Sequence, residues 1–355
     1  MADAGWLDDQ QRMLAESVRT FCARVPPGDQ ATEAVAMTRL AEPGWTGLAM
    51  PETVGGAGAG NLELALVLEQ LGRVLLRSAF TSSIGVALPV LAQCAPAYPE
   101  IERIIAGHRV AVLAFEAFDA DAPPSAVLDD DGRTVTGELL AVTDGDAADL
   151  FVVPAAVGGE VALTVVERNA ARVETVEQVD LTRGLARVGF ERAPAAVLAR
   201  DAAADVRRGL DRAGVALAAE QVGGAARCLD LATSYAQVRE QFGRKIGSFQ
   251  AVAHLCADML VAVRSAEALV FHAARGLDED APDASELASL ALATASDAYT
   301  FAADATMHVH GGIGFTWEHE SHWHLRRAMA QRSQLGSPDH HYLRAGRAVL
   351  SGETR

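Results

Sequence analysis

The sequence predicts a mostly helical α+β protein built in the order helices, strands, helical bundle. Apolar residues follow helical periodicity toward both ends of the chain, whereas the middle carries short β-type runs separated by turn signals. No helical pattern lies between these runs, which favours an antiparallel barrel or sandwich over a parallel sheet. We therefore expect an N-terminal helical domain over residues 1–108, a middle antiparallel β domain over 109–200 and a C-terminal four-helix bundle over 201–355.

Two helices are expected in the first part. One helical face is shared by Leu14, Val18, Phe21, Cys22 and Val25, and Pro26-Pro27 stops that helix. A second helix fits Leu62 to Leu76. The glycine-rich run from Gly55 to Gly60 has the letters of a dinucleotide fingerprint, but its flanks are helical and Pro51 precedes it, so we interpret it as a loop.

The middle part contains five runs of β type, namely Val110 to Phe115, Thr134 to Val142, Leu150 to Val153, Val161 to Val166 and Ala186 to Phe190. Turn signals separate them, namely Asp131-Gly132, Asp144-Gly145 and Gly158-Gly159. The last part returns to helical spacing over Leu217 to Tyr235, Val252 to Ala266 and Leu287 to Met307. These segments are Ala-rich and Pro-poor, which suits close antiparallel packing in a bundle.

Composition excludes several classes of function. The 355 residues are 50% hydrophobic, so the chain can bury a large core and is not disordered. The net charge of -17 argues against nucleic acid or an anionic membrane as the main partner. The scattered Cys22, Cys94, Cys228 and Cys256 form no C-x-x-C pair and fit buried thiols of a reducing compartment. The sequence shows no signal segment and no apolar run near the roughly 20 residues of a membrane helix, which predicts a cytoplasmic protein.

Three polar segments could carry chemistry. Arg239 to Gln250 is a polar, Gly-containing break between two helices, and Arg239 could bind a phosphate there, although a charged helix hairpin is equally compatible. His308 to Phe315 breaks a helix with three glycines, which permits close approach by a cofactor or marks a simple turn. His319, His322 and His324 miss the H-E-x-x-H zinc spacing, and we interpret them as helix-end histidines rather than a metal site.

Taken together, these segments resemble the acyl-CoA dehydrogenase family over essentially the whole chain. The resemblance rests on an opening helix from Asp9, a glycine loop, a bundle helix and the two breaks, carried by Asp9 to Arg12, Gly44 to Glu52, Gly55 to Gly58, Ala219 to Gly224, Arg239 to Gln250 and Gly311 to His319. The family fold is an N-terminal helical domain, a middle β domain and a C-terminal four-helix bundle. That order agrees with the three parts read from residue patterns alone.

The resemblance implies FAD-dependent α,β-dehydrogenation of an acyl-CoA thioester, with an electron-transferring flavoprotein as acceptor. Arg239 resembles the Arg that reaches the FAD diphosphate across a subunit interface, with Phe242 and Gln250 at the other positions of that motif. Gly311 and Gly312 match the glycine pair under the FAD of a neighbouring subunit. Thr143 is similar to the middle-domain Thr beside the flavin ring.

Two departures from the family pattern concern the site. His308 stands where the family usually has Gln, three residues before the glycine pair. Leu335, followed by Gly336-Ser337, stands where the family usually has its catalytic Glu, and Leu cannot accept a proton. Some members carry the base on the first bundle helix. The counted position there is Ala213, and a two-residue slip would bring in Asp211.

These departures leave several hypotheses. The chain resembles the shortened, base-lacking partner subunits of actinobacterial α2β2 acyl-CoA dehydrogenases, some of which act on steroid-derived thioesters and receive the base from a companion subunit. It could instead be a self-sufficient homo-oligomer with a displaced base, with Asp211 as candidate, or a non-catalytic structural subunit. A flavin monooxygenase on the same fold has no residue in its favour. The acyl chain is not predicted.

Overall fold

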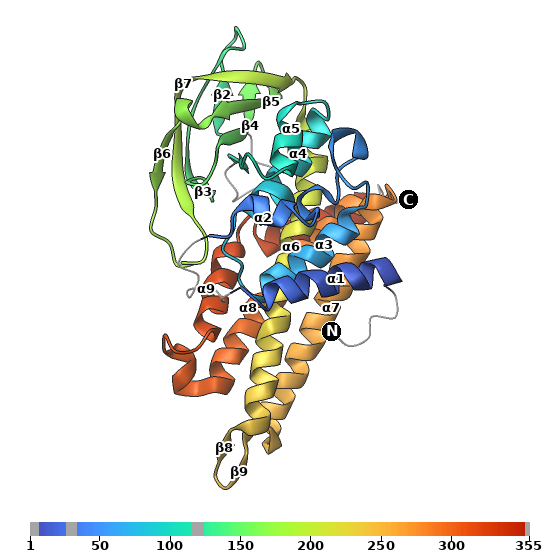
Figure 1. Cartoon of the computed structure of the whole chain (residues 1–355), viewed down its shortest axis with the longest axis vertical. Helices are drawn as coiled ribbons and strands as arrows, with labels where there is room; N and C mark the ends of the chain where they lie inside the picture. Colours follow the sequence, from blue (N-terminus) through green and yellow to red (C-terminus); the bar gives the residue numbers. More distant parts are fainter. Residues whose placement is uncertain (1–6, 26–33, 116–123, 352–355) are drawn as a thin grey trace.

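The computed structural model describes residues 7–25, 34–115 and 124–351, and it confirms the mostly helical α+β class. Seven of the described strands form one sheet at one end of the molecule, and two long helices reach to the other end, where a two-stranded hairpin joins them (Figure 1). The residue boundaries of the three domains stay a prediction. The first strand of the main sheet begins at Ala111, and the long bundle helices begin after the last strand ends at Ala199.

The N-terminal part is a set of short helices, of which the helix over Asn61–Arg73 is almost entirely buried. Its elements are α1 (Asp9–Cys22), α2 (Met37–Ala41), α3 (Asn61–Arg73), a π-helical turn at Thr81–Ala87, α4 (Leu88–Cys94) and α5 (Glu100–Ile105). A capping box between Asp8 and Gln11 starts α1. The predicted stop at Pro26-Pro27 lies outside the described residues. The second helix ends at Arg73 rather than at the predicted Leu76, because Leu75 adopts a φ of 50° that a helix cannot continue.

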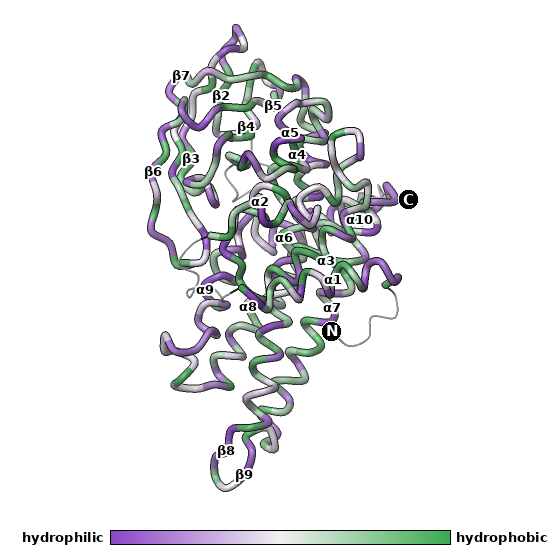
Figure 2. The backbone as a smooth tube through the Cα atoms, viewed as in Figure 1, coloured by the Kyte–Doolittle hydropathy of each residue, from purple (hydrophilic) through white to green (hydrophobic). Residues whose placement is uncertain are grey.

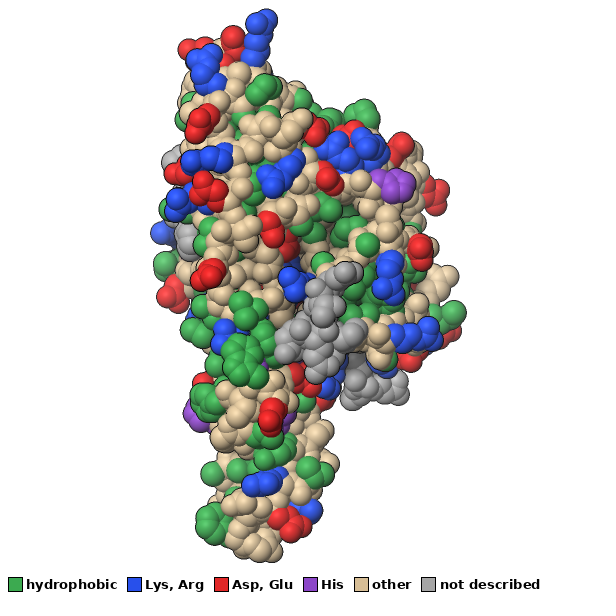
Figure 3. Space-filling model, turned by 60° about the vertical axis from the view of Figure 1, so that its left-hand side comes forward, with side chains coloured by type: hydrophobic (Ala, Val, Ile, Leu, Met, Phe, Trp, Pro, Cys, Tyr) green, Lys and Arg blue, Asp and Glu red, His purple; other side chains and the backbone are tan. Residues whose placement is uncertain are grey.

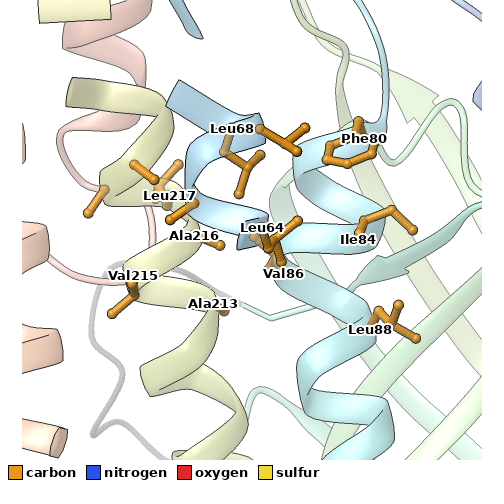
Figure 4. Close-up of a cluster of buried hydrophobic side chains, with 14 of the residues drawn as sticks. Leu64, Leu68, Phe80, Ile84, Val86, Leu88, Ala213, Val215, Ala216 and Leu217 are labelled. Atoms are coloured by element: carbon orange, nitrogen blue, oxygen red, sulfur yellow. The ribbon is translucent and has the colours of Figure 1, made fainter. Parts of the chain in front are cut away.

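Close contact between α3 and α6 (Ala203–Val238) builds the main core. Leucines of α3 face the π-helical turn and α6 in the apolar cluster of Figure 4. Glycine is required where the two backbones meet. A Cβ at Gly72 would lie 2.0 Å from the Glu220 carbonyl oxygen, and a Cβ at Gly223 would lie 1.9 Å from that of Glu69.

The middle part is a barrel-like sheet. Its strands are β1 (Ala111–Leu113), β2 (Ala126–Leu128), β3 (Thr134–Thr143), β4 (Leu150–Val157), β5 (Glu160–Glu167), β6 (Arg172–Thr175) and β7 (Leu185–Ala199). The pairings β4–β2–β3–β7–β5–β4 close a ring, because the long β7 pairs first with β3 and then with β5. The expectation of an antiparallel sheet needs one correction, since β1 and β2 both pair with β4 in parallel. β2 and β6 had no predicted counterpart.

The C-terminal part is the expected bundle. Three long antiparallel helices form it, namely α6, α7 (Gln250–Asp278) and α8 (Ala284–His310), and α10 (Pro338–Ser351) packs on α8. A short hairpin of β8 (Glu240–Gln241) and β9 (Arg244–Lys245) joins α6 to α7 at the far tip, and α9 (Ser321–Gln331) runs beside α8. Green and purple segments alternate along these helices in Figure 2, as expected where one face is buried. No helix among the described residues is long and apolar enough to cross a membrane.

Candidate active site

The larger of two adjoining cavities lies between the sheet and α9. Its volume is about 440 Å³, within the range of small-molecule sites. Its wall combines the end of β3, the segment before β7, α9 and the residues just after α9, namely Ala141, Thr143, Gln178, Val179, Asp180, Arg183, Leu185, Met329, Ala330, Gln331, Ser333 and Gln334. An apolar wall with a few polar groups is typical of a cofactor or substrate site. The structure thus places Thr143 in the wall of a ligand-sized cavity.

A narrower cavity of about 30 Å³ shares Thr143 and Gln334 with the larger one and contains Leu335 in its wall. Ser82 of the π-helical turn and Phe115 after β1 also line it. Two residues that the sequence singled out separately, Thr143 and Leu335, therefore meet at one site. They come from the sheet and from the turn after α9.

Leu335 is held in an unusual backbone conformation. Its φ is 62° and that of Gly336 is 111°, so a bulky side chain occupies the left-handed region. His341 Nε2 donates to the Leu335 carbonyl oxygen at 2.9 Å and holds the turn. The Leu335 side chain is buried and presents only methyl groups, so this position cannot accept a proton.

A buried network of charged side chains adjoins the larger cavity. Glu220 of α6 accepts hydrogen bonds from Arg183 Nη2 at 2.7 Å and from Arg327 Nη1 at 2.6 Å. Arg327 also pairs with Asp180 at 2.5 Å, and Arg183 pairs with Asp144 at 3.2 Å. These five side chains are almost completely buried, and they come from the turn after β3, the segment before β7, α6 and α9. Buried charges of this kind persist only when they are paired and hydrogen-bonded.

The three carboxyl groups of the network differ in the direction in which their pKa values are shifted. Burial opposes the charged form of Glu220, but Arg183 and Arg327 outweigh it and hold the pKa of Glu220 below its usual value. The same balance, with Arg327 as the main partner, lowers the pKa of Asp180. For Asp144 burial wins and raises the pKa, although Arg183, the Ser82 hydroxyl and the Gly184 amide all favour the charged form.

The predicted phosphate-binding motif lies at the other end of the bundle, in and beside the β8–β9 hairpin (Figure 1). Arg239, Phe242 and Gln250 are all exposed, and the Phe242 side chain is 93% exposed. Phe242 and Gly243 take positive φ values in the hairpin turn. The single chain does not bring this motif into either cavity, which suits residues that reach a ligand held by another subunit.

The predicted glycine pair lies at the same end as the hairpin. Tyr235 near the end of α6 stacks on His310 at the end of α8, with ring centroids 4.3 Å apart. His308 is exposed and faces Asp304. A Cβ at Gly311 or Gly312 would meet nothing within 4 Å, so the backbone there is open to an approaching group. Together with a ligand-sized cavity, an exposed Arg motif and an open glycine backbone fit a long cofactor such as FAD.

Asp211 occupies a different environment. It is buried in α6, where Arg344 Nη1 lies 2.8 Å from its Oδ1 and the Ser285 hydroxyl donates to its Oδ2 at 2.7 Å. It lines neither of the two cavities described above. The three histidines near the start of α9 also have protein contacts. His324 Nδ1 lies 2.9 Å from the Tyr299 hydroxyl, and no group of three or more metal-ligating residues forms within the described part of the chain.

The sequence analysis missed the polar residues of the cavity wall, above all Arg183 and Gln331. Arg183 lies in a polar stretch before β7 that is indistinguishable from a solvated turn by pattern alone. Gln331 looks like an ordinary polar residue of α9. Their burial depends on Glu220, which is distant in sequence from both.

Family comparison agrees with this architecture. The family model described as "Acyl-CoA dehydrogenase, C-terminal domain" matches residues 203–350, and "Acyl-CoA dehydrogenase, N-terminal domain" matches residues 8–97. The chain therefore belongs to the acyl-CoA dehydrogenase family, and the family assignment supports FAD as its cofactor.

Individual proteins of the family are similar to this chain over almost its whole length. Acyl-CoA dehydrogenase IpdE2 of Mycobacterium tuberculosis is 34% identical, over 93% of this chain and 94% of that protein. Among solved structures, the steroid acyl-CoA dehydrogenase Tcur3481-Tcur3483 superimposes with a TM-score of 0.85 at 26% identity, covering 98% of each chain. The ChsE4-ChsE5 complex of Mycobacterium tuberculosis superimposes with a TM-score of 0.81 at 26% identity, covering 97% of this chain and 98% of that one.

Proposed function

We propose that this chain is a component of an FAD-dependent acyl-CoA dehydrogenase whose catalytic base is supplied by a second, acyl-CoA dehydrogenase-like subunit. The observation that carries the proposal is Leu335. It lies in the wall of the narrow cavity beside Thr143, at the position where the family usually has its Glu, and it has no group that accepts a proton.

Two other carboxylates, Asp180 in the larger cavity and Asp211 in α6, are poor candidates for the base. Asp180 lines the larger cavity, but Arg327 and Thr182 occupy its oxygens and its pKa is lowered, which weakens it as a base. Asp211 is committed to Arg344 and Ser285. A general base must reach the substrate proton directly or through one water molecule, and neither group is free to do so.

The residues that would hold FAD fall into two groups. Thr143 and the larger cavity would receive the flavin ring, and Arg239, Phe242, Gln250, His308, Gly311 and Gly312 would contact the cofactor of a neighbouring subunit. Bound FAD supplies the hydride acceptor for the β-carbon of the substrate. The exposure of the second group in a single chain supports a cofactor shared across a subunit interface.

Relatives support the type of assembly and substrate. Two solved neighbours carry paired names, Tcur3481-Tcur3483 and the ChsE4-ChsE5 complex, and the first is described as a steroid acyl-CoA dehydrogenase. We infer a bulky, steroid-derived acyl-CoA as the substrate class and an electron-transferring flavoprotein as the acceptor. Hydrophobic side chains gather on the exposed surface in Figure 3, and Phe315, Trp317 and Met329 near α9 are more than half exposed, as expected of a subunit contact.

The test is to purify the chain alone and co-expressed with a second acyl-CoA dehydrogenase-like chain. We expect acyl-CoA oxidation only in the second preparation. Oxidation by the chain alone at the same rate would overturn the proposal and favour a self-sufficient enzyme with a displaced base. The remaining alternative is a structural subunit without flavin, which His308 at a cofactor contact favours. Stoichiometric FAD binding by the complex, lost when Arg239 of this chain is replaced, would exclude this alternative.

A further inference from the structure

Gln334 lines both cavities and therefore stands at their junction. Its side chain is half-buried, and its amide group has no hydrogen-bond partner among the described residues. The turn that carries it is fixed, because its N–H donates to the Gln331 carbonyl oxygen at 3.0 Å and His341 Nε2 donates to the carbonyl oxygen of the next residue, Leu335. A fixed turn thus places an unpaired amide, which can donate and accept, beside the space that a ligand would fill.

The rest of the narrow cavity wall offers little hydrogen-bonding capacity. Its apolar lining consists of Val86, Val112, Leu113, Phe115, Ala141, Val142 and Leu335. Ser82 is polar, but its hydroxyl donates to Asp144 Oδ2 at 2.5 Å and accepts from Arg183 Nη1 at 3.2 Å. Thr143 is the residue that the family resemblance places beside the flavin ring. Among the described residues of this wall, Gln334 is therefore the one left to hydrogen-bond an acyl group.

A ligand that fills the junction removes water from the Gln334 amide. A desolvated amide without a partner costs binding free energy, so a purely hydrocarbon ligand is penalised there. A cavity of about 30 Å³ accepts about two water-sized groups, which is enough for an oxygen atom and too little for a branch of the acyl chain. A hydroxyl or ketone oxygen on the ligand satisfies the amide. Such a wall distinguishes oxygenated acyl groups from hydrocarbon ones.

The neighbouring Leu335 indicates where along the acyl chain this oxygen lies. Under the proposed function, the proton leaves the α-carbon beside Leu335, and Gln334 is the residue next to it in the chain. The carbonyl carbon carries the thioester, and the α- and β-carbons react. The γ-carbon is therefore the nearest carbon that can carry an oxygen which the reaction leaves unchanged.

We propose that Gln334 is a specificity-determining residue that hydrogen-bonds a hydroxyl or ketone oxygen on the γ-carbon of the acyl group. The inference rests on the proposed function, because Leu335 marks the reacting carbons only if an acyl-CoA binds in this site. It adds that the acyl group carries an oxygen close to the reacting carbons.

The test compares two thioesters that differ in one oxygen, 4-cyclohexyl-4-oxobutanoyl-CoA and 4-cyclohexylbutanoyl-CoA. Each competes with the oxidation of a steroid-derived acyl-CoA by the FAD-loaded complex with the partner chain, and its inhibition constant is measured. For the wild type we expect the oxo compound to bind about tenfold more tightly, because the hydrocarbon compound leaves the amide unpaired. Gln334→Leu removes the amide at similar volume, and we expect the preference to disappear or reverse.

Ser333→Ala is the matched control, because Ser333 belongs to the same turn and lines the larger cavity but not the narrow one. It should keep the wild-type preference, and a loss there would assign the effect to the turn and overturn the inference. An unchanged preference in Gln334→Leu would also overturn it. So would equal weakening of both thioesters, since Gln334 would then contact a part that they share, or inhibition by neither thioester in an active complex. A complex that does not oxidise the steroid-derived acyl-CoA would instead contradict the proposed function.

Discussion

Thr143 and Leu335 line the same narrow cavity, although one ends a strand of the middle sheet and the other follows α9. The family resemblance places Thr143 beside the flavin ring and Leu335 at the usual site of the base. Because both residues line one cavity, Leu335 stands beside Thr143 at the position where the family usually has its catalytic Glu. Under the proposed function, the chain keeps the walls of an acyl-CoA dehydrogenase site and takes the proton-accepting group from a partner subunit.

Restoring the carboxylate should restore activity. Leu335→Glu places a titratable group in the cavity wall, and we expect the FAD-loaded chain to oxidise acyl-CoA without the base of a partner. Anaerobic loss of visible flavin absorption upon addition of an acyl-CoA would measure it. Leu335→Gln introduces a side chain of nearly the same shape as Glu that cannot act as a base, so this variant should stay inactive. Equal flavin reduction in both variants would show that the carboxylate is not the limiting feature.

Glu220 should be the most important single residue of the buried network. Glu220→Gln leaves Arg183 and Arg327 without their shared counter-charge. We expect it to lower the free energy of unfolding by about 3–5 kcal/mol. Glu174→Gln is the control, because its pair with Arg172 is exposed and should contribute at most about 0.5 kcal/mol. Urea unfolding of both variants provides the comparison, and similar losses would refute a dominant role for the network.

The pH dependence of stability should carry the signature of Glu220. Its pKa in the folded chain is lowered below the usual 4.5, so its stabilising contribution is fully present above pH 4.5 and is lost as the pH falls through the lower folded value. Asp144 has the opposite sign, since its raised pKa means that stability is gained when it takes up a proton. We therefore expect Asp144→Asn to be tolerated better at neutral pH than Glu220→Gln. Chemical unfolding between pH 3 and pH 7 would report both effects, and a steeper acid loss in Glu220→Gln than in the wild type would contradict this assignment.

Arg239 should contribute to FAD binding from the tip of the bundle. Arg239→Ala removes a charge-assisted hydrogen bond to the diphosphate, and we expect about a 10- to 100-fold higher Kd for FAD in the oligomer. Arg264→Ala serves as the control, because Arg264 is a partly exposed residue of α7 that pairs with Glu267. Equal affinities would place the hairpin outside the cofactor site.

Asp211→Asn separates the two catalytic hypotheses. Because Asp211 is held by Arg344 and Ser285, we expect the variant to keep the turnover of the assembled enzyme within about twofold and to lose about 1–3 kcal/mol of stability. Loss of turnover with an unchanged melting temperature would instead identify Asp211 as the base.

Local patterns predicted the parts of this molecule that depend on local rules. The helical spacing of Val252, Met259 and Val263 found α7, and Asp144-Gly145 marked a turn after β3. Parallel pairing of β1 and β2 with β4 depends on contacts across the sheet, which no turn residue reveals. The polar residues of the cavity wall were not predicted for the same reason, since the burial of Arg183 and Gln331 requires Glu220, which is distant in sequence.

The account depends most on the absence of a base in this chain. The direct measurement is anaerobic reduction of bound FAD by a steroid-derived acyl-CoA, followed by visible absorption in the chain alone and in the complex with its partner. We predict that flavin absorption is lost rapidly in the complex and persists in the chain alone. Rapid loss in the chain alone would contradict the account and return attention to a displaced base.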